Sequence, residues 1–291
     1  MAEQQEITVE TLIENCEDLP TLPDVYLRVR DVIEDPKASM IDIAKALSID
    51  PAMTARVLKL VNSPFYGLTG KVESVSRAAS ILGMQAIHDL VLASSLATTF
   101  SQITPTIMDM KTFWQCCVER GLLARTLART CHLVDSERLF VGGLLSDIGH
   151  LVLYLKLPDL AAELLNQAMA EGRIRPALEQ EKLGFDAAEV GARLLAKWHL
   201  PLNYQLSTRY HQHLSEASER TLELEILHMA GVVMECQLLK LPRELWRQWM
   251  MIQVPELRQM TDEEIAQQIE CAQEDLTLML EMMSPTIDHV A

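Results

Sequence analysis

The residues of this chain that could do chemistry centre on Asp147, which lies in the apolar segment 139–153 with the sequence LFVGGLLSDIGHLVL. A carboxylate within an apolar helix needs a metal ion or an ion-pair partner, because an unpaired buried charge is costly. Ser146 precedes it, and a serine hydroxyl is a poor ligand for transition metals. His150 follows three residues later, so both side chains can share one helix face. Such an Asp-x-x-His could supply two metal ligands, but its histidine is more often found at a surface or boundary.

The elements that must position these residues are helices. The chain has 291 residues, 49% of them hydrophobic, which is enough to bury a sizeable core. Leucine, alanine, methionine and glutamate dominate, and this balance favours an all-α fold. The net charge of −16 would repel a phosphate backbone, so nucleic acid is not an expected partner. Arg120, Arg125 and Arg129 are spread around a helix, where we expect solvated or ion-paired side chains.

The cysteines and the hydropathy bear on the compartment of the protein. The six cysteines show no CxxC spacing, and we expect them to be small core residues. With no signal peptide in the sequence, a reducing cytoplasm is the expected compartment. The most apolar window, 139–157, is interrupted by Asp147, His150 and Lys156, so no membrane-spanning segment is expected.

Proline and capping residues divide the first third of the chain into short helices. Asp50-Pro51 predicts a helix start, with an aspartate N-cap followed by a proline. Residues 39–61 resemble a helix-turn-helix superficially. A recognition helix should present polar and basic residues at its N-terminal end, whereas this one begins with Pro51-Ala52-Met53-Thr54. We therefore set DNA binding aside.

The turn that follows this helix has two interpretations. Its residues are Asn62, Ser63, Pro64, Phe65 and Tyr66. In the structural one, Asn62 closes the helix, Pro64 stops it, and the two aromatic residues anchor the turn in the core. In the other, Phe65 or Tyr66 is exposed in a loop that binds a partner. We favour the first, and the sequence leaves both open.

Longer helices are predicted in the second half of the chain, after a polar connection at 101–109 that separates two sub-bundles. Beyond residue 218, Leu222, Ile226, Met229, Val233 and Cys236 form an apolar stripe at helical spacing. Such a stripe would pack on the domain or pair with a second copy of the chain, so a homo-oligomer is one expectation. The predicted helices cover 110–131, 137–155, 159–171, 187–198, 219–239, 242–251 and 261–282.

Several motifs together resemble one family. They are Leu-Pro-x-Leu-Pro at 19–23, the segment 56–67 with the sequence RVLKLVNSPFYG, Phe113-Trp114, the segment 142–149 with the sequence GGLLSDIG, and Trp198-His199-Leu200-Pro201. In order and spacing they are similar to the HDOD domain, the HD-related output domain of bacterial signalling proteins. The resemblance covers residues 15–215 and implies an HD-domain or phosphodiesterase-like helical bundle. Its sub-bundles would be 15–100 and 110–215, followed by a helical extension at 216–291.

The resemblance also implies where metal ligands would lie, since the parent HD phosphohydrolases bind divalent metals through histidines and aspartates. The corresponding positions here are Cys116, Ser146, Asp147, Ala187 and His211, and a last aspartate would fall near Gly231. Only Asp147 and His211 keep the inherited ligand type, too few to hold a catalytic metal. We therefore expect no metal or other cofactor, and expect Asp147 to pair with His211 or another buried donor. A Cys116, Asp147 and His211 set would be a new site for a soft metal.

The function implied by this resemblance is a non-catalytic signalling or regulatory domain. It would bind a protein partner, or a small ligand in the cleft left by the old active site. The alternative is a residual metal-dependent phosphohydrolase acting on a nucleotide or cyclic dinucleotide. That alternative needs ligands outside the inherited positions, such as His150 or Cys116.

Overall fold

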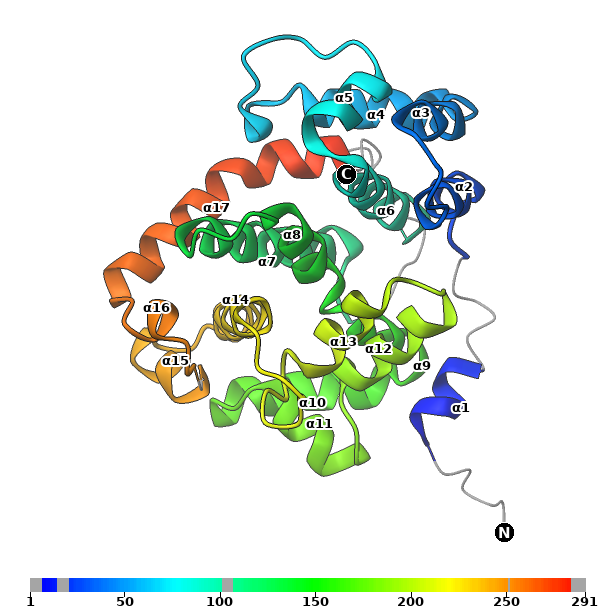
Figure 1. Cartoon of the computed structure of the whole chain (residues 1–291). Helices are drawn as coiled ribbons and strands as arrows, with labels where there is room; N and C mark the ends of the chain where they lie inside the picture. Colours follow the sequence, from blue (N-terminus) through cyan, green and yellow to red (C-terminus); the bar gives the residue numbers. More distant parts are fainter. Residues whose placement is uncertain (1–6, 15–20, 101–106, 251, 284–291) are drawn as a thin grey trace. The chain divides into compact units, whose positions relative to one another are not determined.

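The computed structural model describes residues 7–14, 21–100, 107–250 and 252–283 (Figure 1). Within these ranges all regular structure is helical, which confirms the predicted all-α fold. The chain divides into two compact units, each described separately below. One comprises Met1–Leu19 and Thr104–Ala272, and the other comprises Pro20–Ile103 and Gln273–Ala291. Leu19 and Pro20 of the Leu-Pro-x-Leu-Pro entry, Cys16, and residues 101–106 of the connection lie outside the described residues.

The unit containing residues 20–103 is built from short helices whose starts follow the capping signals. Asp50 caps α4 by accepting a 2.8 Å hydrogen bond from the Met53 amide, as predicted. Ser39 and Asp42 form a capping box at the start of α3. Its elements are α2 (Asp24–Glu34), α3 (Met40–Ser48), α4 (Pro51–Val61), the 3-10 turn η1 (Pro64–Tyr66), α5 (Val75–Leu82) and α6 (Met84–Phe100).

The turn after α4 is held by the Asn62 side chain. Its amide nitrogen donates to the carbonyl oxygens of Leu58 (2.8 Å) and Val72 (2.7 Å), and its oxygen accepts from the Val72 amide (2.7 Å). Phe65 is buried, and Tyr66 is half-buried with its ring edge-on to that of Phe65. These contacts agree with the structural interpretation, in which Asn62 closes the helix and the aromatic residues anchor the turn in the core. Partner binding by the loop stays a prediction.

The unit containing residues 104–272 includes the helix α14, whose residues from Leu224 to Cys236 are all buried. Its elements are α1 (Val9–Glu14), α7 (Met110–Thr130), α8 (Ser136–Leu145), α9 (Ile148–Lys156), α10 (Pro158–Glu171), α11 (Arg175–Leu183), α12 (Ala187–Lys197), α13 (Leu202–Tyr210), α14 (Leu222–Leu238), α15 (Arg243–Trp249), α16 (Pro255–Arg258) and the first half of α17 (Asp262–Met283). By length and composition Ser136–Lys156 could cross a membrane, yet 89% of its apolar window is buried inside the protein.

The structure corrects one prediction about these helices and bears out one of the two outcomes expected for another. The helix predicted over 137–155 is two helices, α8 and α9, which are separated at Ser146 and Asp147. The apolar stripe predicted after residue 218 belongs to a helix, α14, that is buried on every side from Leu224 to Cys236. It packs against α7 and α8 within the unit that comprises Thr104–Ala272, so the stripe packs on the domain, one of the two outcomes expected. The stripe did not show that α14 is buried all around, because its buried polar residues have partners of their own.

Candidate functional site

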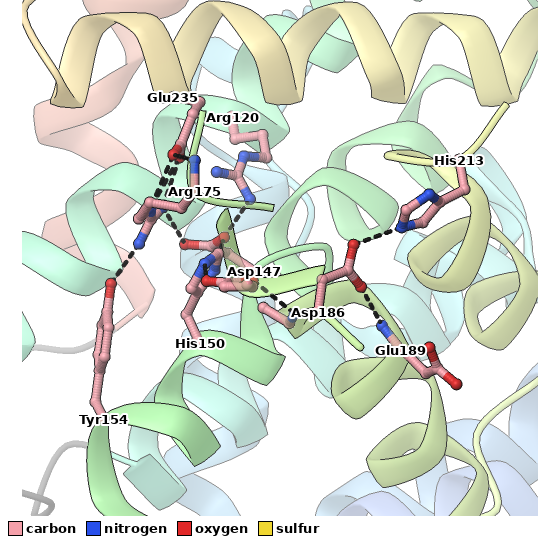
Figure 2. A network of polar contacts seen from close by, with 11 residues as sticks. Arg120, Asp147, His150, Tyr154, Arg175, Asp186, Glu189, His213 and Glu235 are labelled. Carbon is pink, nitrogen blue, oxygen red and sulfur yellow. Dashed lines mark hydrogen bonds and ion pairs between the residues drawn. The ribbon is translucent and has the colours of Figure 1, made fainter. Parts of the chain in front are cut away.

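Asp147 sits at the break between α8 and α9, where it is buried. Its backbone conformation (φ −98°, ψ 2°) ends the helical run. The hydroxyl of the preceding Ser146 donates to the Gly142 carbonyl oxygen at 2.7 Å, which satisfies a carbonyl near the end of α8. The break therefore turns the Asp147 carboxylate toward side chains of neighbouring helices (Figure 2).

Cations surround the Asp147 carboxylate. Arg120 Nη1 of α7 lies 3.0 Å from Asp147 Oδ1, and His150 Nδ1 lies 2.6 Å from the same oxygen. Arg175 Nη2, at the start of α11, lies 4.0 Å from Oδ2. Burial by itself raises the pKa of Asp147, but the charges of Arg120 and then His150 hold it well below its usual range. The carboxylate is therefore ionised and satisfied by side chains.

His150 links Asp147 to a second carboxylate. Its Nε2 lies 2.9 Å from Glu179 Oε1 on α11, while its Nδ1 faces Asp147. Burial and the charge of Arg175 lower the pKa of His150, but the two carboxylates outweigh them and raise it to about 9. A protonated imidazole donates from both nitrogens and so satisfies both neighbours. The expectation of a surface or boundary histidine is wrong, because the side chain is 5% exposed.

A second ion pair closes the network (Figure 2). Arg175 Nε and Nη2 lie 2.8 and 2.6 Å from the two carboxylate oxygens of Glu235 on α14, a bidentate pair. Arg175 Nη1 also donates to the Tyr154 hydroxyl. With His150 protonated, three cations face three carboxylates, so the buried network is neutral. Its charged members are Arg120, Asp147, His150, Arg175, Glu179 and Glu235.

The other inherited ligand positions lie around this network. Cys116 is half-buried, and burial, with the nearby charge of Asp147, raises the pKa of its thiol to about 11. The backbone amide of Ala187 donates to Glu179 Oε2 at 2.9 Å. His211 is buried, its Nδ1 donates to the Thr208 carbonyl oxygen at 2.8 Å, and burial followed by the charge of Arg120 lowers its pKa to about 3. A Cβ added at Gly231 would lie 3.3 Å from the His211 ring, so the last expected ligand position lies beside His211.

Asp147 is thus paired with buried donors other than His211, one of the two outcomes expected. Sequence reasoning missed Arg175, Glu179 and Glu235 altogether. Arg120 carried a signal, because it directly precedes the apolar run 121–124, and a buried arginine implies an ion-pair partner. Glu235 carried one as well, since it is the carboxylate one helical turn beyond Gly231.

The residues present do not fit the divalent metals of the HD phosphohydrolases. Among residues 7–14, 21–100, 107–250 and 252–283, no group of three or more His, Cys, Asp or Glu side chains is placed to hold a metal ion. The carboxylate that would be a ligand, Asp147, faces Arg120 and Arg175, which repel a further cation. The neutral His211 forms no contact with Asp147 that would complete a shared ligand pair.

A glycine contact sets the spacing of α9 and α12 beside this network. A Cβ added at Gly149 would lie 1.8 Å from the Ala187 carbonyl oxygen and 2.7 Å from the Gly191 amide nitrogen. We expect Gly149→Ala to force the two helices apart and to destabilise the fold by about 3 kcal/mol, the upper range for overpacking. Chemical denaturation would measure the change. Gly142→Ala is the control, because its Cβ would meet only flexible Leu227 side-chain atoms at 3.2 Å or more. Equal effects of the two variants would contradict this account of α9 and α12.

Comparison with known proteins agrees with this architecture. An HDOD domain protein with unknown function from Geobacter sulfurreducens is similar in structure, with a TM-score of 0.70 at 20% identity over 94% of this chain and 97% of that one. A candidate phosphohydrolase from Shewanella amazonensis SB2B has a TM-score of 0.67 at 26% identity, covering 94% of this chain and 96% of that one.

A relative from Treponema pallidum, an uncharacterised protein, is 27% identical over 214 residues, which is 72% of this chain. The matched region spans 40% of that relative's length. The family model of the HDOD domain matches residues 19–214, in agreement with the motifs and with the helical bundle. The chain therefore belongs to the HDOD domain family, which is related to the HD phosphohydrolases.

Proposed function

We propose that this protein is a non-catalytic regulatory domain in which an ion-pair network occupies the place of the HD metal site. The observation that carries the proposal is the set of contacts of Asp147, whose carboxylate is held by Arg120 and His150 with Arg175 nearby. A metal-activated water needs open coordination positions on a cation bound by several protein ligands. Here the protein's own cations neutralise the carboxylate, so the arrangement serves structure rather than hydrolysis.

In this proposal the domain acts by binding another protein within bacterial signal transduction, in a reducing cytoplasm. Its charge distribution supports a protein partner. Residues 20–103 contain equal numbers of acidic and basic residues, so the net charge of −16 arises from the remainder of the chain. A surface of this kind attracts basic surfaces and repels phosphate-rich ligands.

The test is the metal content of the purified protein, measured by mass spectrometry, together with hydrolysis of a cyclic dinucleotide and a model phosphodiester in added Mn²⁺. We expect metal far below one ion per chain and no turnover above the buffer blank. About one metal per chain, with turnover that Asp147→Asn abolishes in a folded protein, would establish the phosphohydrolase instead. Asp147→Asn is used because it keeps the size of the side chain.

A further inference from the structure

A groove in the unit containing residues 104–272 lies apart from the Asp147 network and shares none of its residues. It is bordered by α8, α13, α14 and the segment that joins α13 to α14, and its volume is about 390 Å³. This volume is within the range of sites that bind ligands or anchor side chains. The inference below rests on the proposed partner-binding function and specifies its surface.

The floor and one wall of the groove are apolar. Leu139, Leu224 and Leu227 line the floor together with Gly142. Gly142 adds no side chain to this lining, and a Cβ there would meet the Leu227 side chain at 3.2 Å. On the wall, Leu206 of α13 lines the groove and is 46% exposed.

The apolar surface continues beyond the groove along α13. Leu202, one turn before Leu206, is 63% exposed. Both side chains are large, aliphatic and exposed on adjacent turns of one helix. Covering their apolar surface with a partner would contribute on the order of 25 cal/mol of binding free energy per Å² buried. Tyr210 of the same helix is half-buried, lines the groove and adds aromatic surface. Aromatic and aliphatic pockets of this kind typically hold the anchor residues of protein interfaces.

The rim of the groove is acidic. Glu219 and Glu223 line it, with Arg138 as the basic residue among its lining side chains. Arg138 is already engaged, since it lies 3.4 Å from Glu223 and 3.7 Å from Asp135. Arg220, in the same connecting segment, pairs with the buried Glu225 at 3.0 Å. With Arg138 paired to Glu223, Glu219 leaves the charged lining residues with one excess negative charge, which disfavours nucleotides and other phosphate-bearing ligands.

We propose that this groove docks a segment of a partner protein that carries apolar anchor side chains flanked by lysine or arginine. The leucine floor and the exposed Leu206 would take the anchors. Glu219 would pair with a flanking basic residue, and Glu223, which already contacts Arg138, would compete for a second one. Such pairs at a rim contribute mainly to the rate of association and to the choice of partner, whereas the buried anchors supply most of the affinity.

The test selects binders with the full-length protein from a displayed library of random sequences of about 15 residues, or four helical turns. We expect the enriched peptides to combine leucine or aromatic residues with lysine or arginine. Their affinities would be measured by fluorescence anisotropy, using synthetic peptides. Leu206→Glu should weaken them at least about tenfold, or about 1.4 kcal/mol. Glu219→Lys with Glu223→Lys should shift the preference toward acidic flanks.

The control separates the groove from the overall negative charge. Met169→Glu makes the same charge change at a residue of α10 that is 47% exposed and lies outside the groove, and it should leave binding unchanged. Equal weakening by Leu206→Glu and Met169→Glu, acidic enriched peptides, or no enrichment would overturn the groove proposal. None of these results bears on the metal and hydrolysis assays, so failure here is distinguishable from failure of the non-catalytic proposal. Thermal melts would show that each variant is folded.

Discussion

Asp147→Ala is expected to lower the free energy of unfolding by about 3–5 kcal/mol, the usual cost of removing one partner from a buried ion pair. The substitution leaves Arg120 without its carboxylate at 3.0 Å and leaves His150 Nδ1 without an acceptor at 2.6 Å. Both remaining groups are buried, so water does not replace the lost partner. Urea denaturation followed by circular dichroism would measure the loss.

A matched surface pair provides the control for this prediction. Glu163 forms an exposed ion pair with Lys182 at 3.2 Å, and Glu163→Ala should change stability by less than about 0.5 kcal/mol. A metal ligand in an active site would behave differently, because its removal abolishes turnover and relieves repulsion among clustered ligands. An Asp147→Ala protein as stable as the parent would thus contradict the structural role assigned to the network.

The second large effect is a stability maximum near pH 6.5, set by two buried histidines shifted in opposite directions. The pKa of His150 is raised to about 9, so its contribution is complete below about pH 6.5 and is lost as the pH rises through 9. The pKa of His211 is lowered to about 3, so its contribution is complete above about pH 6.5 and is lost as the pH falls toward 3. The alkaline loss from His150 amounts to about 3 kcal/mol.

Unfolding free energies measured from pH 5 to pH 9 would test this dependence of stability on pH. His150→Gln should lower stability near pH 6.5 and flatten the alkaline side, because the group that releases a proton on unfolding is gone. His199→Asn is the control, since His199 is exposed and asparagine tolerates its φ of 55°. If His150→Gln left the loss of stability above pH 6.5 unchanged, His150 would not be the protonated centre of the network.

Local signals in the sequence were sufficient for the all-α class and for the family, but not for the break between α8 and α9. Asp50-Pro51 specified the start of α4 because an aspartate cap and a proline act within one helical turn. The sequence also predicted the loss of metal ligands at Cys116, Ser146 and Ala187. A thiol, a serine hydroxyl and an alanine cannot reproduce a set of histidine and carboxylate ligands. Asp147 was expected to have a buried partner, because an unpaired charge in an apolar segment is costly.

The tertiary structure decided which partner that is. Arg120, Arg175 and Glu235 are separated along the chain by up to 115 positions, and only the packing of α7, α11 and α14 brings their charges together. Periodicity could not show this, because a buried helix such as α14 carries its charged residues inward and has no solvated face. The sequence by itself determined that Cys116, Ser146 and Ala187 stand where the family resemblance places metal ligands. Only the fold determined that arginines and a protonated histidine neutralise the carboxylate that remains, because charge compensation over a few ångströms depends on distances that the order of residues does not contain.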